Sequence, residues 1–115
     1  MRIITFNANG IRSAAEKGFF RWLEQQDADV ACVQETRARN DQLHDGHFRP
    51  PGYHCFYHEA ERPGYAGTAL YCRREPEAIH QGLGWEPVDS EARWIQADFP
   101  GLSVVSLYMP SGSSG

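Results

Sequence analysis

The stretch that decides the fold runs from Arg2 to Glu35 and reads RIITFNANGIRSAAEKGFFRWLEQQDADVACVQE. It begins with the short β-branched and aromatic segment 2–6, which favours a strand, and turn residues follow at 7–10. Segment 30–33 is a continuous apolar run of strand length, typical of a strand that is buried on both faces. The order strand, helix, strand predicts an α/β opening in which the two strands share one sheet.

A helix is predicted between these two strands. Ser13 and Glu16 have the spacing of a capping box, which predicts the helix start. Apolar side chains then recur at helical spacing and predict one buried face running to about Gln26: Ala15, Phe19, Trp22 and Leu23.

The remaining chain reads mostly as short strands separated by turns. Segment 37–47 is polar with room for a short helix, and Pro50-Pro51-Gly52 is a hard break. The predicted strands are 53–57, 67–72, a short one near Ile79, and the two arms 93–99 and 102–109 of a hairpin around Pro100-Gly101.

Composition limits the function classes. The chain has 115 residues and a net charge of −4, which argues against a protein that binds nucleic acid through bulk positive charge. No apolar run approaches the roughly 18 residues of a membrane-spanning helix, so no membrane partner is expected. The three cysteines lack CxxC spacing and are expected to be reduced thiols, which favours a cytoplasmic location.

Glu35 is the main candidate for metal chemistry. It follows the buried strand 30–33, and ligands of open α/β sheets bind beyond the carboxyl ends of the strands. Mg²⁺ is held by one or two carboxylates, with water and substrate oxygens completing its shell. The alternative is that Glu35 is a solvated loop charge paired with Arg37 or Arg39.

Several other side chains have a functional and a purely structural interpretation. Asn7 and Asn9 end the first strand and are either site amides or turn residues. Arg12 lies near the expected helix start, where it could meet a phosphate or be a surface cation. Tyr108 ends the last strand, as a site phenol or a core or rim residue. Glu91-Ala92-Arg93 could form a simple exposed ion pair.

Five blocks in order carry a family resemblance: FNANGIR at 6–12, DVACVQETR at 29–37, GYAGTA at 64–69, EAR at 91–93 and YMPSG at 108–112. Together they resemble the exonuclease III family of abasic-site endonucleases, within the endonuclease/exonuclease/phosphatase superfamily. The resemblance implies an α/β (α+β) fold: half of a four-layer, DNase I-like sandwich, with a mixed sheet and helices on one face.

The resemblance also implies an activity. It is that of a Mg²⁺-dependent phosphodiesterase, with Mn²⁺ as an alternative metal, acting on double-stranded DNA at abasic sites or at 3′ ends. Glu35 corresponds to the metal carboxylate, Asn7 to a metal-site and catalytic group, and Tyr108 to the catalytic tyrosine. Positions that match DNA-contacting or supporting residues are Arg12, Tyr65, Arg93 and Asn9. Ala92 replaces a glycine of the family pattern, which makes the geometry of that turn uncertain at the sequence level.

Members of this family are roughly twice as long, and the blocks expected after Tyr108, including an aspartate and an Asp–His pair, have no counterpart here. Residues 1–110 are therefore expected to be the N-terminal half of the domain, and 111–115 a flexible tail or a truncated loop. Such a half is expected to leave one sheet face uncovered, to associate or unfold partly, and to be inactive alone.

Two other functions remain as alternatives. One is a phosphodiesterase of the same superfamily acting on RNA, inositol phosphates or lipids. The other is a truncated, non-enzymatic fragment that binds DNA or a partner. The NGIR and QETR segments favour the DNA-repair branch.

Overall fold

The computed structural model describes residues 1–110. Residues 111–115, the expected tail or truncated loop, lie outside the described residues. The division of the chain at residue 110 therefore stays a prediction.

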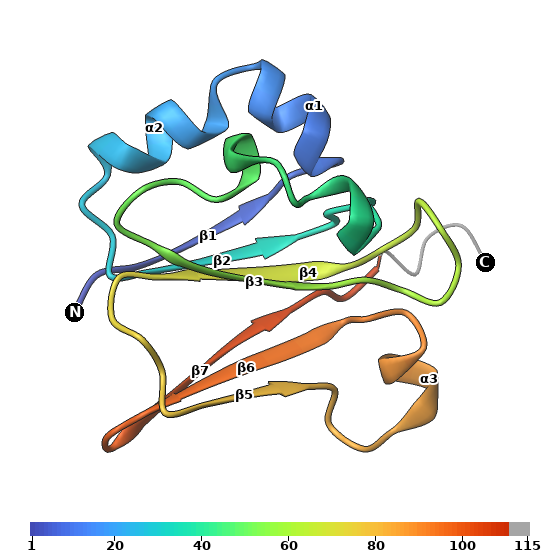
Figure 1. The fold of residues 1–115 in the computed structure, drawn as a ribbon. Helices are drawn as coiled ribbons and strands as arrows, with labels where there is room; N and C mark the ends of the chain where they lie inside the picture. Colours follow the sequence, from blue (N-terminus) through green and yellow to red (C-terminus); the bar gives the residue numbers. More distant parts are fainter. Residues whose placement is uncertain (111–115) are drawn as a thin grey trace.

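Two β-sheets form the centre of the molecule (Figure 1). The first has the order β1 (Ile3–Asn7), β2 (Val30–Gln34), β4 (Thr68–Cys72), β3 (His54–His58). Only its β1–β2 pair is parallel, so the sheet is mixed, as predicted. The second is antiparallel, with the order β5 (Ala78–Gln81), β6 (Trp94–Phe99), β7 (Leu102–Leu107). Its β6–β7 hairpin turns at Pro100-Gly101, which confirms that prediction.

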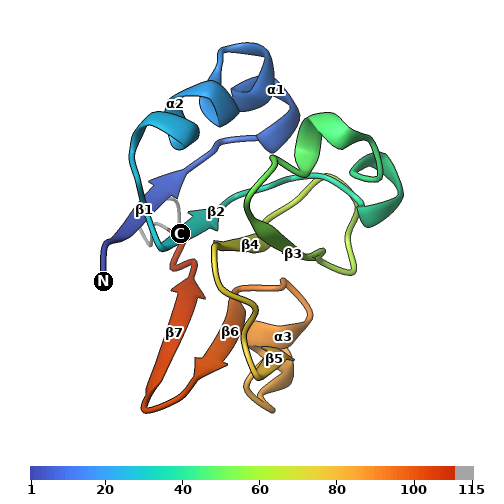
Figure 2. The same cartoon turned by 60° about the vertical axis from the view of Figure 1, so that its left-hand side comes forward.

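Helices cover the outer face of the four-stranded sheet, opposite the second sheet (Figure 2). They are α1 (Ile11–Glu16) and α2 (Phe19–Gln25), and a core of Ile11, Phe19 and Leu23 against Val33 and Tyr71 joins them to the sheet. Two 3₁₀ turns, η1 (Asn40–Gln42) and η2 (Gly46–Phe48), fill the region where a short helix was expected. No helix in the described part of the chain is long and apolar enough to cross a membrane.

The helical segment differs from its prediction in two ways. The helix begins at Ile11 with Gly10 as N-cap, so the capping box at Ser13 and Glu16 is wrong. The reason is that Ile11 N–H donates to the Thr36 carbonyl at 2.9 Å, so a neighbouring loop satisfies a first-turn donor. The single helix expected to continue to Gln26 is also broken by Gly18, whose φ of 96° is left-handed.

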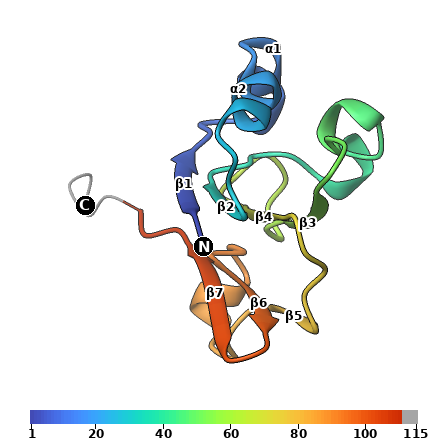
Figure 3. The same ribbon diagram turned by 90° about the vertical axis from the view of Figure 1, so that its left-hand side faces the viewer.

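The second sheet packs against the inner face of the first, and the two sheets enclose their own core (Figure 3). This core joins Cys32, Leu70 and Cys72 of the first sheet to Ile95 and Phe99 of the second. The expectation of an uncovered sheet face is therefore wrong for the four-stranded sheet, because this chain supplies its own second sheet. The three layers are helices, sheet and sheet.

Exposed apolar side chains remain along one edge of both sheets. Ile3 of the edge strand β1 is exposed, as are Leu102 and Leu107 of the edge strand β7. Met1 and Met109 extend the exposed apolar set beyond the strands. The exposed apolar residues of β1 and β7 thus form an edge surface that could drive association.

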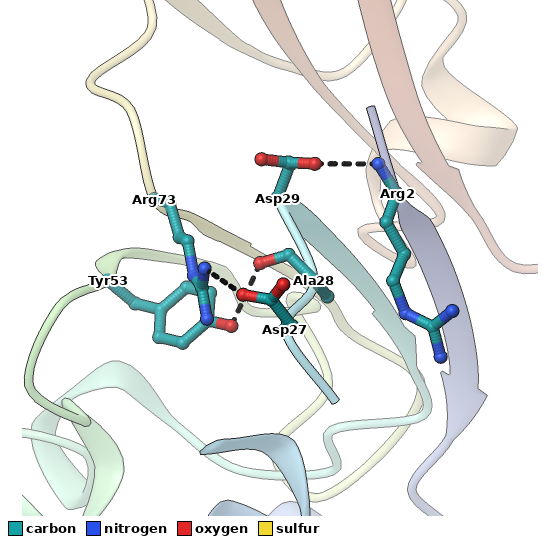
Figure 4. Close-up of polar contacts among 6 residues, drawn as sticks. All are labelled: Arg2, Asp27, Ala28, Asp29, Tyr53 and Arg73. Carbon is teal, nitrogen blue, oxygen red and sulfur yellow. Dashed lines mark hydrogen bonds and ion pairs between the residues drawn. The ribbon is translucent and has the colours of Figure 1, made fainter. Parts of the chain in front are cut away.

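At the amino ends of β1 and β2, polar contacts hold the sheet together (Figure 4). The Arg2 backbone N–H donates to Asp29 at 2.6 Å, and Tyr53 donates from its hydroxyl to the Ala28 carbonyl at 2.9 Å. Arg73 forms an ion pair with Asp27 and lies over the Tyr53 ring. We call this the clamped end of the sheet. The carboxyl ends of the same strands take no part in these contacts.

Leu70→Ala tests the core between the sheets. Leu70 is fully buried there, so the lost contacts and the cavity should lower the free energy of unfolding by about 2–5 kcal/mol. Leu83→Ala, at an exposed leucine, should change it by less than about 0.5 kcal/mol. Urea denaturation followed by circular dichroism measures both, and equal effects would contradict the packing of the two sheets.

Candidate functional site

The candidate site lies where the strands end, on the right-hand side of Figure 1. Asn7 is the last residue of β1, Glu35 follows β2, and Tyr108 follows β7. The parallel pairing of β1 with β2 brings Asn7 opposite Gln34. The Tyr108 N–H donates to the Arg93 carbonyl at 2.8 Å, which brings in the start of β6.

Backbone hydrogen bonds hold the loop Glu35-Thr36-Arg37 on both sides. The carbonyls of Glu35 and Thr36 accept from Gly10 and Ile11 at 2.8 and 2.9 Å. On the other side, the N–H groups of Thr36 and Arg37 donate to the carbonyls of Gly67 and Ala66 at 3.2 and 2.8 Å. The loop that carries Glu35 is therefore fixed between the β1–α1 loop and the β3–β4 loop.

Residues with left-handed backbone conformation cluster in these loops. Among residues 1–110, four of the six non-glycine residues with positive φ lie in them: Asn9, Glu35, Arg37 and Ala66. A fifth, Ala92, lies in the neighbouring turn before β6. Such conformations cost of order 1–3 kcal/mol each and persist only where surrounding contacts impose them. Clustered backbone strain of this kind is typical of functional sites.

Gly67 lies directly against the Thr36 side chain. A Cβ on Gly67 would lie 2.2 Å from Thr36 Oγ1, and the φ of Gly67 is +91°. Thr36 itself is buried at 2% exposure. Glycine is thus required at position 67 by both space and backbone conformation, a role that the sequence analysis did not assign.

Two side chains contact the Glu35 carboxylate directly. Asn7 Nδ2 donates to Glu35 Oε1 at 3.1 Å, and Arg37 forms an ion pair with Oε2 at 3.0 Å. The hydrogen bond from Asn7 is the main cause that lowers the pKa of Glu35, followed by Tyr108 and the charge of Arg37, while burial opposes them. Because its pKa is lowered, Glu35 is an ionised carboxylate at neutral pH, although its side chain is only 15% exposed.

Tyr108 remains a neutral phenol. Burial raises its pKa above the ordinary value, and the neighbouring Glu35 carboxylate raises it further. At neutral pH its hydroxyl is a hydrogen-bond donor. The site therefore combines an ionised carboxylate, Glu35, with a neutral hydrogen-bond donor, Tyr108.

Asn7 and Asn9 act together at the end of β1. Asn7 Oδ1 accepts from the Asn9 backbone N–H at 3.0 Å, while Nδ2 donates to Glu35. Asn7 is thus oriented at both ends of its amide. Asn9 contributes its backbone to this arrangement, and its side chain is exposed.

The remaining predicted residues lie around this centre. Arg12 and Arg37 line a surface cleft of about 460 Å³ with Gly10 and Gly64. Arg93 forms an ion pair with Glu91, as considered from sequence. Tyr65 is 54% exposed and does not reach Glu35; its ring lies under Arg62 at 3.8 Å, a cation–π contact that the sequence analysis missed.

The turn at Ala92 forms despite the missing glycine. Ala92 is fully buried, has a φ of 51°, and its carbonyl accepts from Thr68 Oγ1 at 2.9 Å. The structure thus removes the uncertainty about this turn.

The single carboxylate of this site, Glu35, supplies few protein ligands for a metal ion. Within residues 1–110, no three His, Cys, Asp or Glu side chains gather as metal ligands. Glu35 fits the demand of Mg²⁺ for one or two carboxylates, the rest of the shell being water and substrate oxygens. The Asn7 amide would have to turn to offer its oxygen as well, because that oxygen accepts from the Asn9 N–H and its NH₂ group faces Glu35. The site does not fit a closed structural zinc site, which takes four protein ligands.

Residues 4–113 match the Endonuclease/Exonuclease/phosphatase family. The chain belongs to this family. It is 34% identical to the exodeoxyribonuclease of Bacillus subtilis and to the DNA repair nuclease APEX1 of Danio rerio, each match covering 100% of this chain. Nucleases of the family are generally dependent on a divalent metal.

Solved structures of the family have the same fold. An AP endonuclease from Archaeoglobus fulgidus superimposes with a TM-score of 0.79 at 35% identity over 93% of this chain. A 3′ phosphatase from Neisseria, bound to a product DNA hairpin, gives a TM-score of 0.77 at 26% identity over 91% of this chain. The α/β (α+β), DNase I-like fold class is thereby confirmed.

The chain spans less than half of each relative. It covers 45% of the Bacillus subtilis exodeoxyribonuclease, 38% of the Danio rerio nuclease and 40% of both solved chains. These shares are consistent with the expected N-terminal portion of a family domain.

Asn7→Ala tests how the site holds its carboxylate. Without the amide, the pKa of Glu35 should rise toward the ordinary value, because a hydrogen bond to the charged form is lost. Carboxyl ¹³C chemical shifts followed through a pH titration measure it. Asn40→Ala, at an exposed asparagine on η1, should leave the Glu35 pKa unchanged. An unchanged value in Asn7→Ala would contradict the orienting role.

Proposed function

We propose that this chain is the N-terminal portion of a divalent-metal-dependent DNA-repair phosphodiesterase of the exonuclease III type. Its substrates would be double-stranded DNA at abasic sites and at 3′ ends. The observation that carries the proposal is the ionised Glu35 carboxylate fixed by Asn7 and Arg37. The names of the relatives support it, since they include an exodeoxyribonuclease and an AP endonuclease.

Glu35 and Asn7 would hold the metal, with Mg²⁺ proposed and Mn²⁺ as an alternative. When bound, the metal would neutralise charge on the nonbridging phosphate oxygens. For Glu35 to bind a cation, its carboxylate must turn from Arg37 or share its oxygens with it. Arg37 would then be free to pair with a phosphate.

Tyr108 would donate its hydroxyl to a phosphate oxygen or to the groups around it. Its raised pKa keeps the proton in place at neutral pH. Arg12 and Arg93, with Tyr65 and Asn9 in the flanking loops, would contact DNA. The exposed ring of Tyr65 supports such a contact, as does the cleft shared by Arg12 and Arg37.

A further partner would be the C-terminal half of the same domain. The support for it is the 38–45% coverage of the relatives and the exposed apolar edge of β1 and β7. The aspartate and histidine groups expected from the family would come from that half. The chain by itself would then have little or no catalytic activity.

Three free cysteines support the cytoplasm as the proposed compartment: Cys32, Cys55 and Cys72. Burial raises the pKa values of all three thiols to about 11 or 12, which makes them unreactive structural thiols.

The test is incision of a duplex oligonucleotide with one abasic-site analogue, with and without Mg²⁺. The 115-residue chain is assayed beside a longer version that continues along the gene. Only the longer version should cut, and only with the metal. Absence of cutting by both would contradict the DNA-repair assignment, and cleavage of an RNA, inositol-phosphate or lipid phosphodiester instead would favour another branch of the superfamily.

Glu35→Gln in the longer version should lower the incision rate at least about 100-fold, because removing even a group that orients a metal ligand costs about 10–100-fold. Glu24→Gln, at an exposed glutamate of α2, removes the same charge away from the site and should have no effect. If Glu35→Gln cuts at the normal rate, Glu35 is a loop charge and the metal role is wrong.

A further inference from the structure

A cleft lined by residues of both sheets lies at the clamped end, away from the candidate site. Its volume is about 540 Å³, and its lining includes the buried Val30 and Phe99. Leu102, which is 42% exposed, adds an apolar side chain from the β6–β7 hairpin. Arg73 and Arg74 line the same cleft from the segment after β4. We call this surface the hairpin cleft, and it combines apolar side chains with two cations.

The charges of the hairpin cleft favour an acidic occupant. Asp29 is the one acid among its lining residues, all of which lie within 1–110, and this carboxylate already accepts the Arg2 backbone N–H at 2.6 Å. Arg73 is paired with Asp27, whereas Arg74 takes part in none of the ion pairs formed within residues 1–110. An unpaired arginine beside apolar side chains fits a partner that offers a carboxylate next to an apolar group.

The opposite end of the molecule carries a complementary feature (Figure 1). The loop between β5 and α3 (Glu86–Asp89) exposes two large apolar side chains, Leu83 at 47% and Trp85 at 60%. Glu86 follows Trp85 directly, is exposed, and takes part in no ion pair of the described chain. We call Leu83, Trp85 and Glu86 the α3 knob. It offers apolar surface with a free carboxylate beside it.

The α3 knob is held in position by its own loop. The Asp89 carboxylate accepts the backbone N–H groups of Leu83 and Gly84 at 2.9 and 3.0 Å. A Cβ on Gly82, whose φ is +105°, would lie 2.8 Å from the same carboxylate. Rigid presentation of this kind lowers the entropy cost of binding, and tryptophan is enriched among the residues that dominate interface energies.

The positions of the two features determine how they can meet. The β6–β7 turn and the hairpin cleft lie at the left in Figure 1, and the α3 knob lies at the right. A molecule cannot fold its own knob into its own cleft across the length of the sheets. Contact between them therefore joins two copies of the chain.

We propose that this chain associates head to tail, with the α3 knob of one copy seated in the hairpin cleft of the next. Trp85 packs against the apolar side chains of the cleft, and Glu86 pairs with Arg74. Such a contact leaves a free knob at one end and a free cleft at the other, so association continues beyond the dimer unless a ring closes. The inference does not depend on the proposed DNA substrate.

The test is analytical ultracentrifugation of the 115-residue chain from about 10 µM to about 1 mM, because an interface built on three side chains is small and its association weak. The average mass of the unchanged chain should rise with concentration. Trp85→Ala removes the knob, and Arg74→Glu sets two carboxylates against each other at the contact. Each variant should lower the association constant at least about tenfold.

A mixture of the two variants distinguishes a head-to-tail contact from other kinds of association. Arg74→Glu keeps an intact knob and Trp85→Ala keeps an intact cleft. The mixture should therefore form a one-to-one dimer that neither variant forms alone and that grows no further. A mixture that stays monomeric would overturn the proposal, as would an unchanged chain that stays monomeric at the highest concentration.

Leu107→Gln is the matched control, since Leu107 is an exposed leucine of the β7 edge that does not line the hairpin cleft. It should leave association unchanged. If Leu107→Gln abolishes association and Trp85→Ala does not, the sheet edge joins the copies and the proposal is wrong. If Trp85→Ala loses its cooperative melting transition, Glu86→Arg replaces it, and mixing Glu86→Arg with Arg74→Glu should restore the association that each lacks alone.

Discussion

The loop Glu35-Thr36-Arg37 is the constraint on which the rest of the candidate site depends. Its backbone is bonded to Gly10 and Ile11 on one side and to Ala66 and Gly67 on the other. Those bonds oblige Glu35 and Arg37 to adopt left-handed backbone, and they require glycine at position 67. They also satisfy the first N–H groups of α1, so one set of contacts fixes the helix start and the carboxylate together.

The two-sheet core explains why this loop can stay strained. β2 and β4, which carry the loop's flanks, are buried on both faces, between the helices and the second sheet. Ser106 of β7 donates to the Val33 carbonyl at 3.0 Å, just before the loop begins. A rigid scaffold of this kind can hold several unfavourable φ values at one end. The opposite end is closed by the Arg73 clamp and presents no comparable cluster of strain among residues 1–110.

Much of this could be predicted from the sequence, for identifiable reasons. Strands such as 30–33 and the hairpin at Pro100-Gly101 have strong local signals, and Glu35, Asn7 and Tyr108 each stand directly at a strand end. The predicted start of α1 was wrong because its first backbone N–H groups donate to carbonyls of a loop more than twenty residues away. No local sequence pattern records such a contact. The short helix α3 (Glu86–Asp89) was missed because four residues carry too little periodicity. The facing of the two sheets and the Thr36–Gly67 contact depend on tertiary packing.

The central claim is that Glu35 and Asn7 form the cation site of this chain. Paramagnetic broadening of backbone amide resonances by Mn²⁺ tests it directly, because the effect falls steeply with distance from the ion and needs no catalysis. Titration of the intact chain should broaden the amides of 7–10 and 35–37 first, and Glu35→Gln should remove this effect while residues 27–29 at the clamped end stay sharp throughout. Broadening spread evenly over exposed carboxylates, or unchanged in Glu35→Gln, would contradict the account.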